Sequence, residues 1–175
     1  MSARDDELQP DLLGEALAAE PVRPHAELRT KVLGSIASGS RFAGFLDRLA
    51  TFFDLAQERA GELIREASGD ARSWEVMPVA GVRLFHLSGG PRIAAADCGL
   101  VRIEPGARFP RHRHRGDEWS FVLAGEAVEE GTGARWAPGD LVHRPADSAH
   151  AFRSVGSEPL LFAVVLHGGL ELDEG

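Results

Sequence analysis

The chain has 175 residues, of which 43% are hydrophobic and 26% are charged, and its formal net charge at pH 7 is −8. This length is enough for one barrel of ordinary size with a short helical appendage, and too small for two full domains. The acidic balance leaves no basic surface to neutralise phosphates, which argues against direct binding to nucleic acid or to an anionic membrane. Any macromolecular partner is therefore expected to be another protein.

The N-terminus and the cysteine content indicate the cellular compartment. The first twenty residues lack the basic region and apolar core of a signal peptide, and no stretch approaches the roughly 18 consecutive apolar residues that a membrane helix needs. Cys98 is the single cysteine, so it cannot form an internal disulfide. The sequence therefore predicts a cytoplasmic protein without a membrane span.

The first third of the chain is predicted to be helical. Pro10–Leu13 opens a short helix, Pro21 and Pro24 interrupt it, and residues 26–37 resume helical spacing. Between residues 41 and 67 large apolar side chains recur with a 3.6-residue period, which predicts either one amphipathic helix or two consecutive helices. We favour packing of this apolar face on the barrel or on a second subunit over a dedicated role in binding a partner.

Beyond residue 68 the hydrophobic pattern changes to short apolar segments separated by glycine and proline turns. Many short strands of this kind predict a sandwich or barrel that closes to hide its sheet edges. The chain is therefore divided into a helical N-terminal region, residues 1–68, and a β domain, residues 69–175. The predicted strands are residues 82–87, 94–103, 119–123, 126–128, 141–144, 149–154 and 160–166.

Three candidate metal ligands lie within seven consecutive residues. Side chains two residues apart on a strand point to the same face, so His112 and His114 can aim both imidazoles at one point. Residues 115–117 can form a bend that returns Glu118 to that face on the next strand, where its carboxylate offers an oxygen ligand. His150, which follows a predicted turn on a distant strand, is the natural fourth ligand. This pattern predicts one divalent metal per chain.

The same residues resemble the cupin superfamily. Its first motif, Gly-x5-His-x-His-x3-Glu-x6-Gly, is matched without a gap from Gly106 to Gly125. Its second motif is matched at the first glycine, the proline and the histidine, whereas Asp147 replaces the second glycine and Ser154 the asparagine. Aspartate tolerates a positive φ better than most residues, so the turn is expected to persist. The resemblance implies a mainly β chain with a jelly-roll barrel, a short helical N-terminal region and a homodimer.

Two alternatives to the metal site are surface histidines in an arginine-rich strand and a barrel without metal. We favour the metal site because three unpaired imidazoles and a carboxylate would be costly to bury without a cation. Zinc is expected, with iron, manganese or nickel as alternatives. By strand parity, Phe109, Ser120, Val122 and Phe152 are expected to line the ligand pocket. The arginines that alternate with the histidines between residues 108 and 115 are expected to face solvent.

A narrower resemblance covers residues 74–168, which look like the C-terminal cupin of ChrR-type anti-sigma factors. It rests mainly on Trp74, on Glu104–His114 and on Pro138–Asp140. In that family the cupin binds a metal and senses singlet oxygen or related oxidants, while a helical N-terminal zinc domain with a His-x3-Cys-x2-Cys signature binds a sigma factor. This signature is missing here, because Cys98 is the only cysteine.

Two classes of function follow. As a sensory or regulatory module, the barrel would hold a metal and a small ligand, and would act through a protein partner, such as a sigma factor or regulator, bound by the helical N-terminal region. As an enzyme, the same site with Fe, Mn or Ni would support a dioxygenase, and with Zn or Ni an isomerase or hydrolase. The local resemblance and the lack of an acid–base pair beyond the ligands favour the sensor, so no catalytic residue is assigned.

Overall fold

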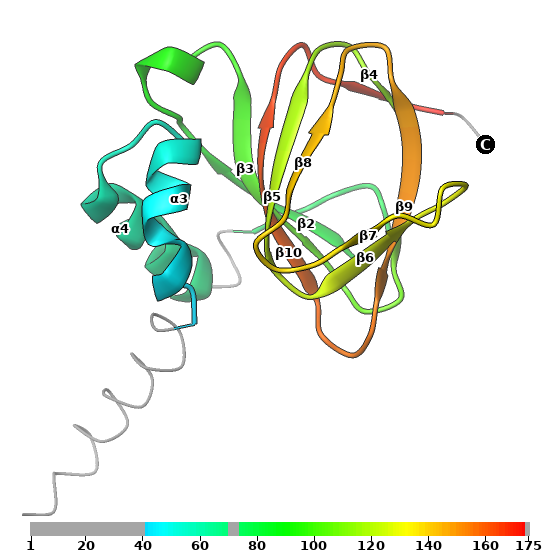
Figure 1. Cartoon of the computed structure of the whole chain (residues 1–175), viewed down its shortest axis with the longest axis horizontal. Helices are drawn as coiled ribbons and strands as arrows, with labels where there is room; N and C mark the ends of the chain where they lie inside the picture. Colours follow the sequence, from blue (N-terminus) through cyan, green and yellow to red (C-terminus); the bar gives the residue numbers. More distant parts are fainter. Residues whose placement is uncertain (1–40, 70–73, 174–175) are drawn as a thin grey trace, which may run out of the picture. The chain divides into compact units, whose positions relative to one another are not determined.

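The computed structural model describes residues 41–69 and 74–173 (Figure 1). It begins with the short 3-10 helix η2 (Ala43–Phe45) and the α-helices α3 (Leu46–Phe52) and α4 (Gln57–Gly69). The alternative of two consecutive helices between residues 41 and 67 is therefore correct, and that of a single helix is wrong. Asp54, with a φ of +55°, breaks the helical backbone between them. The helices predicted at residues 10–13 and 26–37 lie outside the described residues.

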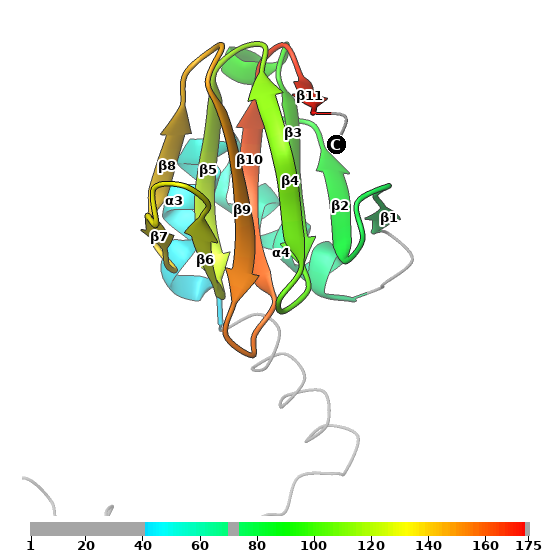
Figure 2. The same ribbon diagram turned by 90° about the vertical axis from the view of Figure 1, so that its right-hand side faces the viewer.

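Two antiparallel sheets follow the helices and face each other (Figure 2). The strand order is β1-β2-β3-β10-β5-β8 in the six-stranded sheet and β11-β4-β9-β6-β7 in the five-stranded sheet. This arrangement confirms the predicted mainly β cupin barrel. The elements are β1 (Glu75–Val76), β2 (Val82–Leu87), the 3-10 turn η4 (Pro91–Ile93), β3 (Asp97–Ile103), β4 (Arg108–His114), β5 (Glu118–Ala124), β6 (Glu126–Glu129), β7 (Arg135–Trp136), β8 (Leu141–Arg144), β9 (Ala149–Val155), β10 (Leu160–Leu166) and β11 (Leu170–Leu172).

All seven predicted strands are present in the described residues. Residues 82–87, 141–144 and 160–166 agree residue for residue with β2, β8 and β10. The strand predicted at residues 94–103 starts too early, because residues 94–96 form a turn after η4 and β3 begins only at Asp97. Strand β4 was predicted without bounds, as the strand that carries His112 and His114. The short strands β1, β7 and β11 were not predicted, since two or three residues are too few to show an alternating pattern.

The second cupin motif forms its turn without the usual glycine. Asp147 adopts the left-handed conformation with a φ of +65°. Its backbone N–H donates to the carbonyl oxygen of His114 at 2.8 Å, and the N–H of His114 donates to the carbonyl oxygen of Ser148 at 2.9 Å. The expectation that aspartate preserves this turn is confirmed, and the turn fixes the end of β4 beside the start of β9.

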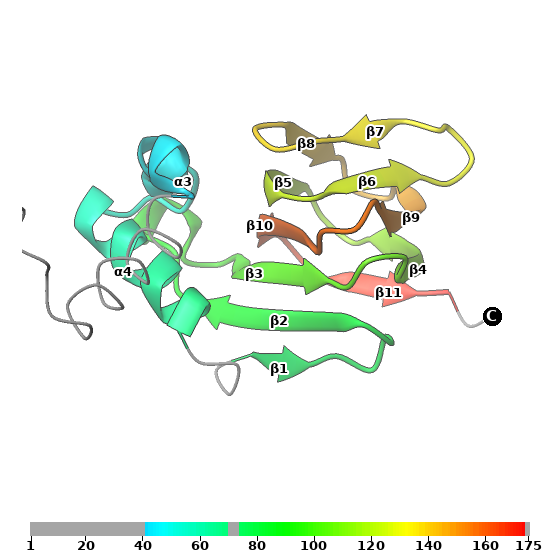
Figure 3. The same cartoon turned by 90° about the horizontal axis from the view of Figure 1, so that it is seen from below.

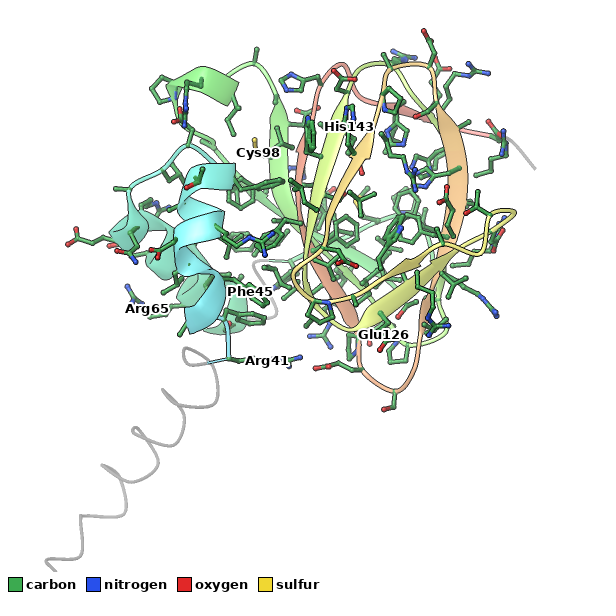
Figure 4. All side chains as sticks on the ribbon, viewed as in Figure 1. Arg41, Phe45, Arg65, Cys98, Glu126 and His143 are labelled. Carbon is green, nitrogen blue, oxygen red and sulfur yellow. The ribbon has the colours of Figure 1, made fainter. Side chains whose placement is uncertain are left out.

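The helices pack on the outer face of the six-stranded sheet (Figure 3). Leu49 and Phe53 are buried in one apolar cluster with Phe121 of β5. The rings of Phe45 and Phe121 meet edge to face with centroids 5.5 Å apart, and Figure 4 shows Phe45 between the helices and the sheet. The Arg48 guanidinium lies 4.2 Å from the centroid of the Phe121 ring. The apolar face of the helices therefore packs on the barrel, as expected.

A second contact ties the turn between α3 and α4 to the connection between β2 and β3. The carboxylate of Asp54 accepts the backbone N–H of Arg92 at 2.8 Å and its Nε–H at 2.7 Å. The N–H of Gly90 donates to the carbonyl oxygen of Phe53 at 2.8 Å. A Cβ atom at Gly90 would overlap the carbonyl oxygen of Asp54, so this approach requires glycine.

Helices α3 and α4 belong to the same compact unit as the barrel. The division into residues 1–68 and 69–175 stays a prediction, because residues 1–40 lie outside the described part of the chain. Within the described ranges, no helix is long and apolar enough to cross a membrane.

Leu49→Ala is expected to weaken the fold through the contact between helices and barrel. Leu49 is 1% exposed, and removing a buried leucine side chain typically lowers the free energy of unfolding by about 2–5 kcal/mol. Urea denaturation measures this loss. Leu141→Ala is the matched control, since Leu141 is 51% exposed and should change the free energy by less than about 0.5 kcal/mol. Equal losses in the two variants would contradict this packing.

Candidate metal centre

His112 and His114 of β4 and His150 of β9 form a compact group between the sheets. One nitrogen from each ring lies within 4.8 Å of the others. His112 and His150 stand directly opposite each other in the β4–β9 register, and their ring centroids are 4.5 Å apart. All three side chains are buried, and that of His114 is fully inaccessible. The structure thus brings together the three imidazoles that strand parity and motif spacing had selected.

Burial lowers the pKa of each imidazole. The pKa of His114 is lowered to about 4 and that of His150 to about 3. In both cases desolvation is the largest cause, followed by the neighbouring imidazole of His112 and the Arg144 guanidinium. The pKa of His112 is also lowered, because burial outweighs a hydrogen bond to the carbonyl oxygen of Pro110. The rings are therefore neutral at pH 7, which leaves nitrogen lone pairs free to bind a metal.

The hydrogen bonding of the rings fits a bound cation. Both ring nitrogens of His114 and both of His150 are buried without a hydrogen-bond partner. Each such atom costs about 1–3 kcal/mol if nothing replaces its lost hydration. In His112, Nδ1 lies 2.9 Å from the carbonyl oxygen of Pro110, and donation there leaves Nε2 available. A divalent metal held by the three imidazoles would give one nitrogen of each ring a partner.

Glu118 of β5 lies beside the histidines but outside their compact group. Its Oε2 is 3.5 Å from Nδ1 of His114, and its Oε1 accepts the hydroxyl of Ser120 at 2.9 Å. Burial raises the pKa of this carboxyl, although the Ser120 hydrogen bond and the positive charge of Arg144 act in the opposite direction. The bend after β4 does return Glu118 to the barrel interior, whereas its role as fourth ligand stays a prediction.

Glu118→Gln tests that role. If the carboxylate binds the metal, the neutral amide is expected to weaken metal affinity by about 10-fold or more, because a negative oxygen ligand is lost. Titration of the metal-free protein with Zn²⁺ in competition with a coloured chelator measures the affinity. An unchanged affinity would leave the three histidines as the ligand set.

A second buried carboxylate, Glu129 at the end of β6, was not predicted from the sequence. Its Oε1 is 3.6 Å from Nδ1 of His150. Its Oε2 accepts Nη2 of Arg144 at 2.7 Å and the hydroxyl of Thr132 at 3.1 Å. The available signal was strand parity, because Glu129 pairs with the buried Phe152 and is thus a charged residue at an inward position.

A pocket of about 110 Å³ adjoins the histidines on the side of β2, β3 and β10. Phe109, His112 and Phe152 line it, and the two phenyl rings stack with centroids 5.4 Å apart and planes 2° from parallel. Of the other predicted lining residues, Ser120 bonds to Glu118 and Val122 lies in the closed interior core. All four predicted side chains face inward, but of these four only Phe109 and Phe152 border this pocket. Most of the remaining lining is aliphatic or aromatic: Met77, Val82, Leu84, Val101, Phe162, Val164, Leu166 and Leu170, with His86, Asp97 and Cys98.

Two arginines on β4 near the histidines, Arg108 and Arg111, pair with carboxylates. Nε of Arg108 is 2.7 Å from Oε1 of Glu130, and Nε of Arg111 is 3.1 Å from Oδ2 of Asp173. More than half of each of these two arginine side chains is exposed. The expectation that these arginines face solvent is confirmed for both.

Comparison with known proteins agrees with this fold. Residues 99–167 match the family model of the cupin domain. A stretch of 87 residues is 36% identical to dimethylsulfoniopropionate lyase DddQ of Ruegeria pomeroyi and covers 47% of this chain and 43% of the lyase. A stretch of 70 residues is 34% identical to 5-nitrosalicylic acid 1,2-dioxygenase of Bradyrhizobium sp and covers 39% of this chain and 34% of the dioxygenase. The matched stretches span less than half the length of either relative.

Among solved structures, the complex of Rhodobacter sphaeroides SigE with the anti-sigma ChrR contains a similar chain. The similarity covers 89% of this chain and 75% of the other, with a TM-score of 0.55 and 22% sequence identity. An identity this low shows a shared fold and nothing about activity. Residues 99–167 are thus similar to a cupin domain, and the narrower resemblance to ChrR is supported at the level of the fold.

Proposed function

We propose that this protein is a metal-dependent cupin enzyme that acts on a small organic molecule. The proposal is carried by the buried group of His112, His114 and His150, in which His114 and His150 have unpartnered ring nitrogens and His112 borders an apolar pocket. Two curated relatives, a lyase and a dioxygenase, are enzymes, which supports catalysis over the sensory role that the local sequence resemblance favoured. Glu118 is proposed as the fourth ligand.

The residues around the histidines define what each part of the site contributes. A bound divalent metal would supply Lewis acidity and, if it is iron or manganese, a means of activating dioxygen. The neutral imidazoles would hold it, while the stacked rings of Phe109 and Phe152 keep water from one side of the site. The Arg144 guanidinium, bonded to Glu129, adds a fixed positive charge near the ligands.

The pocket indicates the class of substrate. A charged group placed against its aliphatic and aromatic walls would lose hydration, and Asp97 is the one residue among the described lining that always carries a charge at pH 7. A suitable substrate therefore has an apolar body, such as an aromatic ring, that fits against Phe109 and Phe152, and a polar end that reaches the metal beyond His112. An aromatic hydroxy acid meets both requirements better than a fully charged zwitterion such as dimethylsulfoniopropionate.

Elemental analysis and an activity assay on one sample test the proposal. The protein is purified without chelator or added metal, its metal content is measured, and oxygen uptake is followed with salicylate-type substrates and product release with dimethylsulfoniopropionate. Stoichiometric iron, manganese or nickel with substrate-dependent oxygen consumption is the expected result. Stoichiometric zinc without turnover of either compound would contradict a role as an oxygenase or lyase.

One structural feature favours a second candidate, a ChrR-like sensory module that acts through a protein partner. The connection between β2 and β3 bonds to the helical turn through Gly90 and Arg92, and it leads directly to Asp97 and Cys98 at the pocket. A change in the pocket could thus reach the helices. Hydrogen exchange of residues 46–69 with and without metal tests this coupling, since unchanged protection of the helices would remove the structural support for a sensor. A homodimer likewise stays a proposal.

A further inference from the structure

Two charged side chains, the buried Glu129 and the partly buried Arg144, lie beside the histidines without belonging to the proposed ligand set. Glu129 comes from β6 of the five-stranded sheet, and Arg144 comes from β8 of the six-stranded sheet. Glu129 is 7% exposed, and in the β5–β8 register Arg144 stands opposite the buried Glu118. Nη2 of Arg144 and Oε2 of Glu129 meet at 2.7 Å, so this ion pair joins the two sheets next to the candidate metal centre.

The two oxygens of Glu129 have different surroundings. Oε2 accepts both Arg144 Nη2 and the Thr132 hydroxyl, which fixes the carboxylate from two directions. Oε1 faces the imidazole of His150, with Nδ1 at 3.6 Å. This separation exceeds an N–H···O hydrogen bond by a few tenths of an ångström, a gap that a small rotation of the ring would close. Neither nitrogen of His150 has another hydrogen-bond partner.

His112 already shows the arrangement that His150 lacks. Its Nδ1 is within hydrogen-bond distance of the Pro110 carbonyl oxygen, so its Nε2 points away from that bond and is free. Histidines that bind metals commonly donate the second ring N–H to a carbonyl or carboxylate, which fixes the tautomer and makes the ligating nitrogen more basic. For His150, the oxygen placed to accept that proton is Oε1 of Glu129.

We propose that Glu129 is the positioning residue of His150: its Oε1 accepts the Nδ1 proton, which presents Nε2 of His150 to the metal. Arg144 and Thr132 hold the carboxylate in place for this task. The inference rests on the proposed metal site. Glu129 also gives the partly buried Arg144 a counter-charge, because an unpaired guanidinium at this position would oppose cation binding.

The test is the Zn²⁺ affinity of Glu129→Gln, measured by competition with a coloured chelator. We expect the affinity to fall about 10- to 100-fold relative to the wild type. Glu130→Gln is the matched control, because the neighbouring carboxylate carries the same charge but pairs with Arg108 on the surface, and it should bind Zn²⁺ as the wild type does. The visible spectrum of the Co²⁺-loaded protein is expected to change in Glu129→Gln and to stay the same in Glu130→Gln.

A double variant separates positioning from simple charge. Glu129→Gln leaves Arg144 without its partner, and that unpaired charge alone would repel a cation. Glu129→Gln combined with Arg144→Met removes both charges, so it also leaves no unpaired buried ion to disturb folding. If Glu129 positions His150, the double variant stays weak. Recovery of wild-type affinity in the double variant would overturn the proposal.

The outcomes also distinguish this inference from the proposed function. A wild-type protein that does not bind Zn²⁺ or Co²⁺ would remove the metal site itself. A wild type that binds tightly, with Glu129→Gln binding equally well and giving the same Co²⁺ spectrum, would leave the metal site intact and overturn only the role of Glu129.

Discussion

Replacing His114 by alanine is expected to abolish stoichiometric metal binding and, with it, the stabilisation that the metal confers. His114 belongs to the group of three histidines, is fully buried, and has two unpartnered ring nitrogens. A metal that binds only the folded state at a thousand times its Kd stabilises that state by about 4 kcal/mol. The wild type should therefore melt at a higher temperature with added Zn²⁺, whereas His114→Ala should show no such shift and no bound metal on elemental analysis.

The matched control for this variant is His143→Ala. His143 lies on β8, where its partly exposed ring stacks on Trp119 with centroids 4.1 Å apart, and it does not belong to the histidine group. This variant should keep both the metal and the Zn²⁺-dependent rise in melting temperature. Stoichiometric metal in His114→Ala would mean that the cation is held elsewhere and that the ligand assignment is wrong.

The positions of the three imidazoles were predictable from one local rule and from the spacing of the cupin motifs. His112 and His114 share a face through the two-residue period of a strand, and the spacing of the motifs selected Glu118 and His150. The turn that aligns β9 with β4 also depends on one residue, Asp147, whose tolerance of a positive φ could be judged from its type. The relative placement of His112 and His114 thus needs no distant strand, whereas His150 meets them through the pairing of β9 with β4.

The partners of the histidines depend on distant packing, and the sequence did not reveal them. Glu129 and Arg144 lie on strands of different sheets, so their contact follows from how the sheets face each other. The pocket shows the same limit. Strand parity correctly predicted that Ser120 and Val122 point inward. Which inward side chains border the pocket depends instead on how neighbouring side chains fill the interior.

The fold alone does not distinguish an enzyme from a sensor, so the distinction depends on the site. Similar cupin chains occur in a lyase, in a dioxygenase and in a complex with a sigma factor. What separates these roles is the metal, the substrate that the pocket admits and the coupling of the pocket to the helices. The apolar pocket beside His112 favours a small-molecule reaction, whereas the contact between Asp54 and Arg92 supplies the path that a sensor would need.

Acidification is expected to destabilise the metal-free protein well above the pH at which most carboxylates titrate. In the unfolded chain a histidine takes up its proton near pH 6.5. In the folded protein the pKa of His114 is about 4 and that of His150 about 3, mainly because burial disfavours the charged ring. Between these values the unfolded state binds more protons than the folded state, so the free energy of unfolding rises with pH through this window and levels off above it.

Urea denaturation of chelator-treated protein at pH 7, 6, 5 and 4 measures this effect. One pKa unit corresponds to about 1.4 kcal/mol, so the two histidines together should cost the protein several kcal/mol by pH 4. His150→Gln removes one of the two groups and should flatten the profile between pH 6.5 and 5, where carboxylates contribute little. Because protons compete with a metal for the same nitrogens, the metal-loaded wild type should release Zn²⁺ over the same range. Equal slopes for wild type and His150→Gln would show that His150 takes up its proton in the folded protein as readily as in the unfolded chain, which its burial among the other imidazoles argues against.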